Sequence, residues 1–101
     1  MGFVKVASVD DVPPGNMKGV EAGGKEIMIA NVEGTFYAIG DPCTHMGCKL
    51  SDGRIYEKVV QCICHGSRFN VETGGVVDSP AVEAEPVYKV KVEGGDVYVE
   101  I

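Results

Sequence analysis

The sequence has few basic residues and only two histidines, and it lacks tryptophan altogether. Nine lysines and arginines stand against 15 aspartates and glutamates, which gives a formal net charge of −6. This acidic balance argues against a nucleic-acid partner, because phosphates would repel such a surface, and also against anionic membranes. It suits a protein that docks on basic partner proteins, because charge steering raises encounter rates.

The sequence also lacks a long apolar run. The longest stretch, Ile27 to Val32, is interrupted by Asn31 and is far too short to cross a membrane. The N-terminus runs into a strand-like pattern from Phe3 without the charged and apolar regions of a signal peptide. We therefore expect a cytoplasmic protein with no membrane span, and we expect it to be a monomer.

What the sequence does contain is strand signals in a length that fits one domain, residues 1–101. Alternating or β-branched segments predict strands at 3–9, 25–32, 35–39, 87–92 and 97–101, with a candidate pair within 55–63. Glu33-Gly34 and Gly94-Gly95-Asp96 predict hairpin turns. No window has helical period, so we expect an all-β antiparallel sandwich. Its scaffold would be residues 1–40 and 82–101, and the stretch 41–81 holds all four cysteines and both histidines.

Two short motifs in that middle stretch pair a thiolate donor with an imidazole donor. The first is Cys43-Thr44-His45-Met46-Gly47-Cys48 and the second is Cys62-Ile63-Cys64-His65-Gly66-Ser67. Two cysteines and two histidines could hold one zinc ion in a tetrahedron, although zinc motifs usually pair Cys with Cys and His with His. They could equally hold a 2Fe–2S cluster, with Cys43 and Cys62 on one iron and His45 and His65 on the other, which is the ligand set of a Rieske centre.

The two motifs resemble the Rieske family, whose pattern is C-x-H followed by C-x-x-H. The resemblance implies one Rieske 2Fe–2S cluster, bound by Cys43, His45, Cys62 and His65, in a Rieske-like fold whose small cluster-binding subdomain is about residues 41–81. The longer forms C-T-H-x-G-C and C-x-C-H-G-S are similar to the higher-potential members. That similarity implies a disulfide between Cys48 and Cys64.

The resemblance also implies roles for residues around the ligands. Gly47 and Gly66 would let backbone N–H groups approach the sulfides, and Met46 would shield the cluster from water. Ser67 would donate a hydrogen bond to a bridging sulfide, and Pro80 would lie in a third loop, 75–81, that covers the cluster. Phe69 departs from the higher-potential pattern, which has Tyr there, so one hydrogen bond to a ligand sulfur would be missing and the potential lowered.

The resemblance implies an electron carrier and not an enzyme, because both histidines would be used by the cluster and none remains for a second iron site. We expect a one-electron carrier between a reductase and an oxygenase or other acceptor. The alternatives are a Rieske domain that accepts electrons from a quinol, a zinc-stabilised binding module, and an accessory subunit that has lost its cluster. The last would lack the ligands, and all four are present.

Overall fold

The computed structural model describes residues 2–42, 48–64, 66–78 and 83–101, and these form three antiparallel sheets. The first sheet consists of β1 (Phe3–Ser8), β11 (Asp96–Glu100) and β10 (Val90–Glu93), in that order. The second has the order β2 (Met17–Ala22), β3 (Lys25–Val32), β4 (Thr35–Gly40), β9 (Val87–Tyr88). The third has the order β5 (Arg54–Tyr56), β6 (Val59–Gln61), β7 (Arg68–Asn70), β8 (Val76–Asp78).

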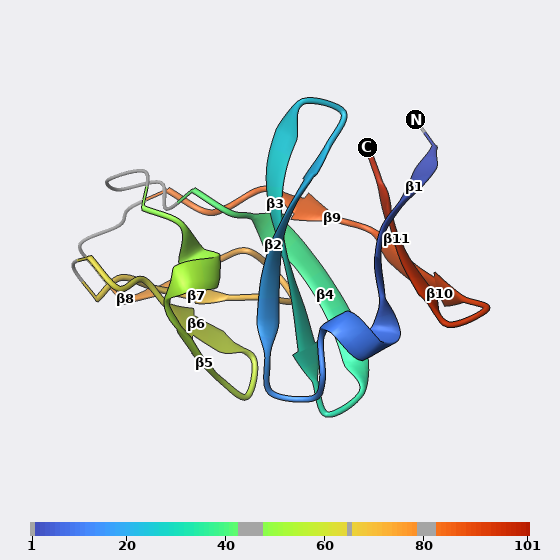
Figure 1. Ribbon diagram of the computed structural model, residues 1–101. Helices are drawn as coiled ribbons and strands as arrows, with labels where there is room; N and C mark the ends of the chain where they lie inside the picture. The colour runs from blue at the N-terminus through green and yellow to red at the C-terminus, as the bar shows by residue number, and fades with distance from the viewer. Residues whose placement is uncertain (1, 43–47, 65, 79–82) are drawn as a thin grey trace.

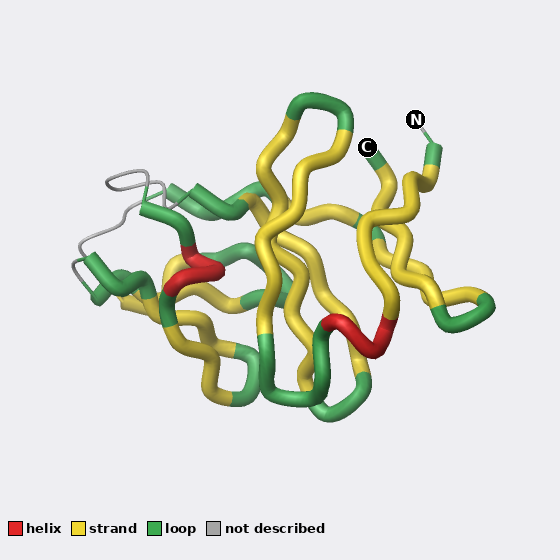
Figure 2. Tube along the Cα trace, in the orientation of Figure 1, coloured by secondary structure: helices red, strands yellow, loops and turns green. Residues whose placement is uncertain are grey.

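The described residues contain two short 3-10 helices, η1 (Val9–Asp11) and η2 (Leu50–Asp52), which Figure 2 draws in red. No described helix is long and apolar enough to cross a membrane. The all-β antiparallel prediction is therefore confirmed, and no longer helix interrupts the sheets within the described ranges.

The second sheet lies between the other two, as Figure 1 shows. Its central strand β3 is buried from Ile27 to Asn31, and successive side chains enter different cores because they point to opposite faces. Ile27 and Ile29 pack with Val97 and Val99 of the first sheet. Met28 and Ala30 pack into the core beneath the third sheet. One strand thereby ties the outer sheet to the sheet that carries the second motif.

The two predicted hairpins are present. The turn Glu33-Gly34 joins β3 to β4, and both residues have positive φ, 52° and 93°, as a tight hairpin turn with matching twist requires. The same geometry recurs at Gly94-Gly95 between β10 and β11. The candidate pair within 55–63 is also found, as β5 and β6.

Two predictions about strands were incomplete. The segment 87–92 is not one strand, because the chain leaves the second sheet after Tyr88 and joins the first at Val90. The strand β2 was not predicted at all, nor were the three-residue strands β7 and β8. Alternation reveals an extended segment but does not tell which sheet it joins, so the break at Lys89 left no mark in the pattern.

Candidate metal centre

Of the four predicted ligands, Cys62 belongs to the described part of the chain. It follows β6 directly and is buried, with 2% of its surface exposed. Cys43, His45 and His65 lie outside the described residues, as do Met46, Gly47 and Pro80. The roles of these six residues remain predictions. The framework around them is described, and it shows how the two motif loops are held.

The first motif loop is closed at its base by a network around Asp41. This carboxylate is buried, and it accepts hydrogen bonds from the Ser51 N–H at 2.8 Å and the Ser51 hydroxyl at 3.0 Å. The backbone N–H of Leu50 donates to the Asp41 carbonyl at 2.7 Å, and Pro42 forms a bridge with Lys49. A buried carboxylate is costly unless its oxygens accept hydrogen bonds. The Asp41–Ser51 pair therefore fixes both ends of the loop that carries the first motif.

Two glycines let neighbouring backbones approach this network. A Cβ atom at Gly19 of β2 would lie 2.7 Å from the Asp41 carboxylate and 2.8 Å from the Ser51 hydroxyl oxygen. A Cβ atom at Gly53 would collide with the carbonyl oxygen of Gln61, the residue before Cys62. Gly53 thus brings the end of the first loop against the start of the second. Sequence reasoning missed Asp41, Ser51, Gly19 and Gly53 as parts of the site.

The second motif loop is a tight turn between β6 and β7. The N–H of Cys62 donates to the carbonyl of Ser67 at 2.8 Å, and the N–H of Gly66 donates to the carbonyl of Cys62 at 3.1 Å. Gly66 has a φ of +79°, in the region that favours glycine. Ser67 is fully buried beside this turn. These bonds fix the backbone on either side of the predicted ligand Cys62.

A disulfide joins the two loops. It links Cys48 at the end of the first motif to Cys64 in the second, with the Cα atoms 6.4 Å apart. Cys64 is exposed and Cys48 is half-buried. The sulfur of Cys62 lies close by, because the three sulfur atoms of Cys48, Cys62 and Cys64 are all within 4.8 Å of one another.

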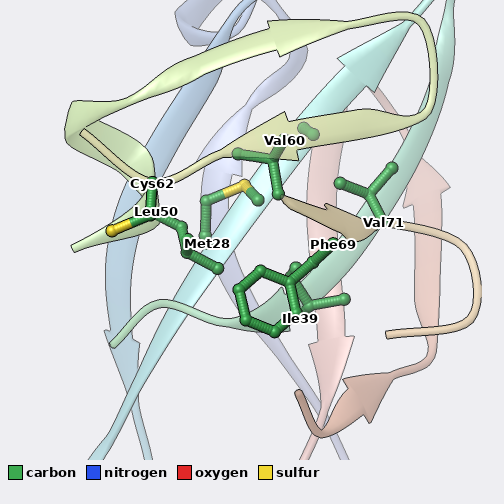
Figure 3. Close-up of a cluster of buried hydrophobic side chains, with 8 residues drawn as sticks. Met28, Ile39, Leu50, Val60, Cys62, Phe69 and Val71 are labelled. Carbon is green, nitrogen blue, oxygen red and sulfur yellow. The ribbon is translucent and has the colours of Figure 1, made fainter. Parts of the chain in front are cut away.

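Cys62 and Phe69 share one apolar core. Both are buried, and they pack with residues of the middle sheet and of η2, among them Met28, Ile39 and Leu50. Figure 3 shows the sulfur of Cys62 pointing away from the ring of Phe69. The core therefore excludes water from one side of Cys62 while its sulfur is directed out of that core.

The outer face of the third sheet carries both arginines of the chain. Arg54, Gln61 and Arg68 are paired across β5, β6 and β7, so they form a row on one face. Arg68 forms an ion pair with Asp78 of β8 at 3.4 Å. An open depression of about 320 Å³ lies between this row and the second loop, lined by Arg54, Gln61, Cys62 and Ile63 among others.

Lys58 and Asp11, whose pKa values are shifted, lie away from the motif loops. Lys58, in the turn between β5 and β6, has a pKa above its ordinary value because it donates a hydrogen bond to Glu72 at 3.1 Å. Asp11 in η1 has a pKa below its ordinary value, first because the Ser8 N–H donates to it and second because Lys18 lies near. Both groups are on the surface, so they bear on the scaffold and not on the ligands.

Comparisons with known proteins decide between the Rieske cluster and the zinc site. The model of the Rieske [2Fe-2S] domain matches residues 2–92. The chain belongs to the Rieske [2Fe-2S] family. It is 42% identical over 101 residues to the biphenyl dioxygenase ferredoxin subunit of Pseudomonas sp. strain KKS102, covering 99% of this chain and 93% of that protein. It is 38% identical to the biphenyl 2,3-dioxygenase ferredoxin component of Rhodococcus jostii strain RHA1, over 100% of this chain and 94% of that protein.

Solved structures agree with this Rieske assignment. The ferredoxin of carbazole 1,9a-dioxygenase from Nocardioides aromaticivorans IC177 superposes with a TM-score of 0.93 at 30% identity, covering 98% of this chain and 97% of that one. A chain from a complex of reduced oxygenase and oxidised ferredoxin in carbazole 1,9a-dioxygenase gives a TM-score of 0.91 at 37% identity, covering 96% and 91% of the two chains.

These matches confirm several predictions made from the motifs. The family carries a 2Fe–2S cluster of the Rieske type, so the predicted cofactor is confirmed in place of zinc. The relatives are ferredoxin components, so the predicted electron carrier is confirmed in place of an enzyme. A carrier that works between a reductase and an oxygenase also agrees with them. The ligand set itself rests on the motifs.

Proposed function

We propose that this Rieske ferredoxin belongs to an aromatic-ring-hydroxylating dioxygenase system, where it takes one electron at a time from a reductase and delivers it to a terminal oxygenase. The observation that carries the proposal is the similarity over the whole chain to a biphenyl dioxygenase ferredoxin, at 42% identity. A naphthalene dioxygenase ferredoxin component of Pseudomonas aeruginosa, at 32% identity over 98% of the chain, points to the same class of acceptor.

Cys43, His45, Cys62 and His65 are the proposed ligands, and residues 41–81 the proposed cluster-binding subdomain on a scaffold of 1–40 and 82–101. When bound, the cluster supplies one-electron transfer. Two neutral imidazoles in place of thiolates leave the ligand set less negative, which favours acceptance of the electron. The chemistry of the described residues fits this role, because Cys62 is buried against an apolar core with its sulfur directed outward.

The framework described above contributes rigidity and exclusion of water. The Asp41–Ser51 pair, the turn from Cys62 to Ser67 and the disulfide each fix one part of the two loops. We expect loops held in this way to change little between oxidation states, so that little energy is spent on rearrangement when the electron moves. In other metal sites, residues that hydrogen-bond to the ligands orient them. We expect the Asp41–Ser51 pair and the turn from Cys62 to Ser67 to orient the predicted ligands here in a similar way.

A finer proposal concerns the potential. We infer from Cys48, Cys64 and Ser67 that this ferredoxin resembles the higher-potential Rieske proteins, and the disulfide between the two loops supports that inference. Phe69 is the exception, since it has no hydroxyl group to donate. We therefore expect a potential below those of the proteins that have Tyr at this place and above those that lack Ser67 and the cysteine pair. We also propose that the protein acts in the cytoplasm, as a monomer.

Electron delivery to a defined oxygenase tests the proposed function. The purified holo-ferredoxin replaces the native ferredoxin in an assay with the reductase and terminal oxygenase of the Pseudomonas sp. strain KKS102 biphenyl system. We expect product formation that depends on the ferredoxin and is abolished in His45→Ala, with Glu93→Ala on the scaffold as the matched control.

A quinol assay separates the alternative acceptor pathway. The holo-ferredoxin is mixed with a short-chain quinol in the absence of reductase, and reduction is followed by its visible absorbance. We expect reduction by the reductase to be much faster than by the quinol. Rapid reduction by quinol with no transfer to the oxygenase would favour a respiratory-type Rieske domain instead.

A further inference from the structure

Three sulfur atoms gather at one place, and the proposed function uses only one of them as a metal ligand. Those of Cys48, Cys62 and Cys64 lie within 4.8 Å of one another. Cys62 is the predicted iron ligand, while the other two are joined as a disulfide. Burial increases through the group, from the exposed Cys64 to the half-buried Cys48 and the buried Cys62. The group is therefore open to solvent on the Cys64 side.

The Cys62 sulfur lies within 4.8 Å of each of the other two, which is close enough for one thiophilic cation to bridge them once the disulfide is open. Zinc binds thiolate sulfur at about 2.3 Å in a tetrahedral arrangement, so thiolates on the same ion stand roughly 3.8 Å apart. The Cys48–Cys64 disulfide occupies two of the sulfurs and prevents such binding. A dithiol or phosphine reductant supplies two electrons, and with two protons the S–S bond becomes two thiols. Rotation about the side-chain bonds of Cys48 and Cys64 then separates their sulfurs to the required distance.

We propose that reduction of the Cys48–Cys64 disulfide creates a three-thiolate zinc site made of Cys48, Cys62 and Cys64. Each thiol gives up its proton to solvent on binding, and a water molecule from the exposed side completes the coordination. The disulfide then has a second effect besides linking the loops. It reserves Cys62 for iron by removing the two sulfurs that would otherwise join it on a competing cation. That last consequence, unlike the zinc site, rests on the proposed function.

Alkylation of the cluster-free chain of 101 residues tests the site. The disulfide is reduced with a phosphine, Zn²⁺ is added, and iodoacetamide labelling of each cysteine is followed by mass spectrometry. We expect zinc to slow labelling of both Cys48 and Cys64 by about a hundredfold at free zinc roughly 100 times its Kd. Protection of Cys43 and Cys62 alone would place zinc on the predicted iron ligands and overturn the proposal, as would no protection at all.

Single substitutions show whether the three sulfurs act together. Cys64→Ser changes an exposed side chain and should remove most of the protection that zinc gives Cys48 against labelling. Cys62→Ser should remove the protection of both Cys48 and Cys64. Ile63 lies between Cys62 and Cys64 in the sequence and is also exposed. Ile63→Ser leaves all three sulfurs in place, so zinc should still protect Cys48 and Cys64 from labelling. Far-ultraviolet circular dichroism checks that each variant retains its fold. Unchanged protection of Cys48 in Cys64→Ser would contradict a shared site.

Reconstitution separates this proposal from the function. The disulfide-intact chain is incubated with iron and sulfide, with and without zinc, and the reduced chain is treated in the same way. We expect zinc to lower the cluster yield far more in the reduced chain than in the intact one. A chain that shows the zinc footprint but never binds iron would refute the proposed function alone. A chain that binds iron but shows no zinc footprint would refute the zinc site alone.

Discussion

Asp41 accepts two hydrogen bonds from Ser51, one from its N–H at 2.8 Å and one from its hydroxyl at 3.0 Å. The pair closes the loop that carries the first motif, and the carboxylate is 1% exposed. Removal of one partner from a buried pair leaves the other without its hydrogen bond, which costs more than the net gain from forming the bond. In the sequence, Asp41 looks like a simple turn residue before Pro42. Its two hydrogen bonds mean that the stability of the loop should depend strongly on it.

Asp41→Ala is the first prediction. We expect it to lower the free energy of unfolding by about 1–3 kcal/mol, because the N–H and hydroxyl of Ser51 lose their acceptor. Ser51→Ala removes the hydroxyl alone and should cost about 1 kcal/mol. Denaturant unfolding followed by circular dichroism measures both variants. Asp52→Ala removes the same charge from an exposed neighbour and is the control, and an equal loss in that variant would contradict the role of the pair.

The disulfide gives the second prediction. The double variant Cys48→Ser/Cys64→Ser should keep the proposed ligands and lose roughly 3 kcal/mol of stability, the chain-entropy value for a loop of about 15 residues. The separation of the two cysteines is 16 residues. Thermal loss of visible absorbance should occur at a lower temperature than in the wild type. Unaltered thermal loss, or two free thiols in the alkylated native protein besides the ligands, would mean that the bond does not stabilise the loops.

The third prediction concerns the hydroxyl groups near the ligands. A phenol at position 69 that donates to a ligand sulfur would stabilise the reduced form more, because the bond strengthens as negative charge increases. If that difference is about 1 kcal/mol, Phe69→Tyr should raise the potential by roughly 40 mV for one electron. Ser67→Ala should lower it by a similar or larger amount. Voltammetry at neutral pH measures both shifts.

The burial of Phe69 calls for a control that adds the same hydroxyl group elsewhere. Phe69 is fully buried in the core with Cys62, so the added oxygen could also disturb packing. Phe36→Tyr makes the same chemical change on β4, in the other core, and should leave the potential unchanged. A potential that is unchanged or lower in Phe69→Tyr, with the cluster intact, would show that residue 69 does not face a ligand sulfur.

Part of this architecture follows from the sequence and part does not. β3, β4 and the two hairpins were predictable because alternation and paired positive-φ turns are local signals. β2 was not, because Gly19 in its middle weakens the strand pattern. The structure shows why glycine stands there, since any side chain would meet Asp41 and Ser51. Gly19 therefore weakens the strand pattern of β2 and also leaves the space that the Asp41–Ser51 pair occupies.

The site divides in the same way. The motifs predict the ligand types because chemistry fixes the residues and their spacing. The supporting pair Asp41–Ser51 could not be predicted, because the sequence shows a carboxylate before a proline but not its burial. The approach of Gly53 to Gln61 follows from the pairing of β5 with β6, in which the next residue, Arg54, lies opposite Gln61. Asp41 and Ser51 are only 10 residues apart, but their contact depends on how the intervening loop folds back, and hydrophobic periodicity does not report that.

The reduction potential tests the central claim most directly, because it depends on whether two histidines or two further cysteines bind the irons. A redox titration of the purified holo-ferredoxin followed by its visible absorbance is sufficient. Ligation by Cys43, His45, Cys62 and His65 predicts a midpoint within roughly −150 to +300 mV, the range of Rieske centres. A midpoint near about −400 mV, typical of plant-type ferredoxins with four cysteine ligands, would contradict the proposed ligand set.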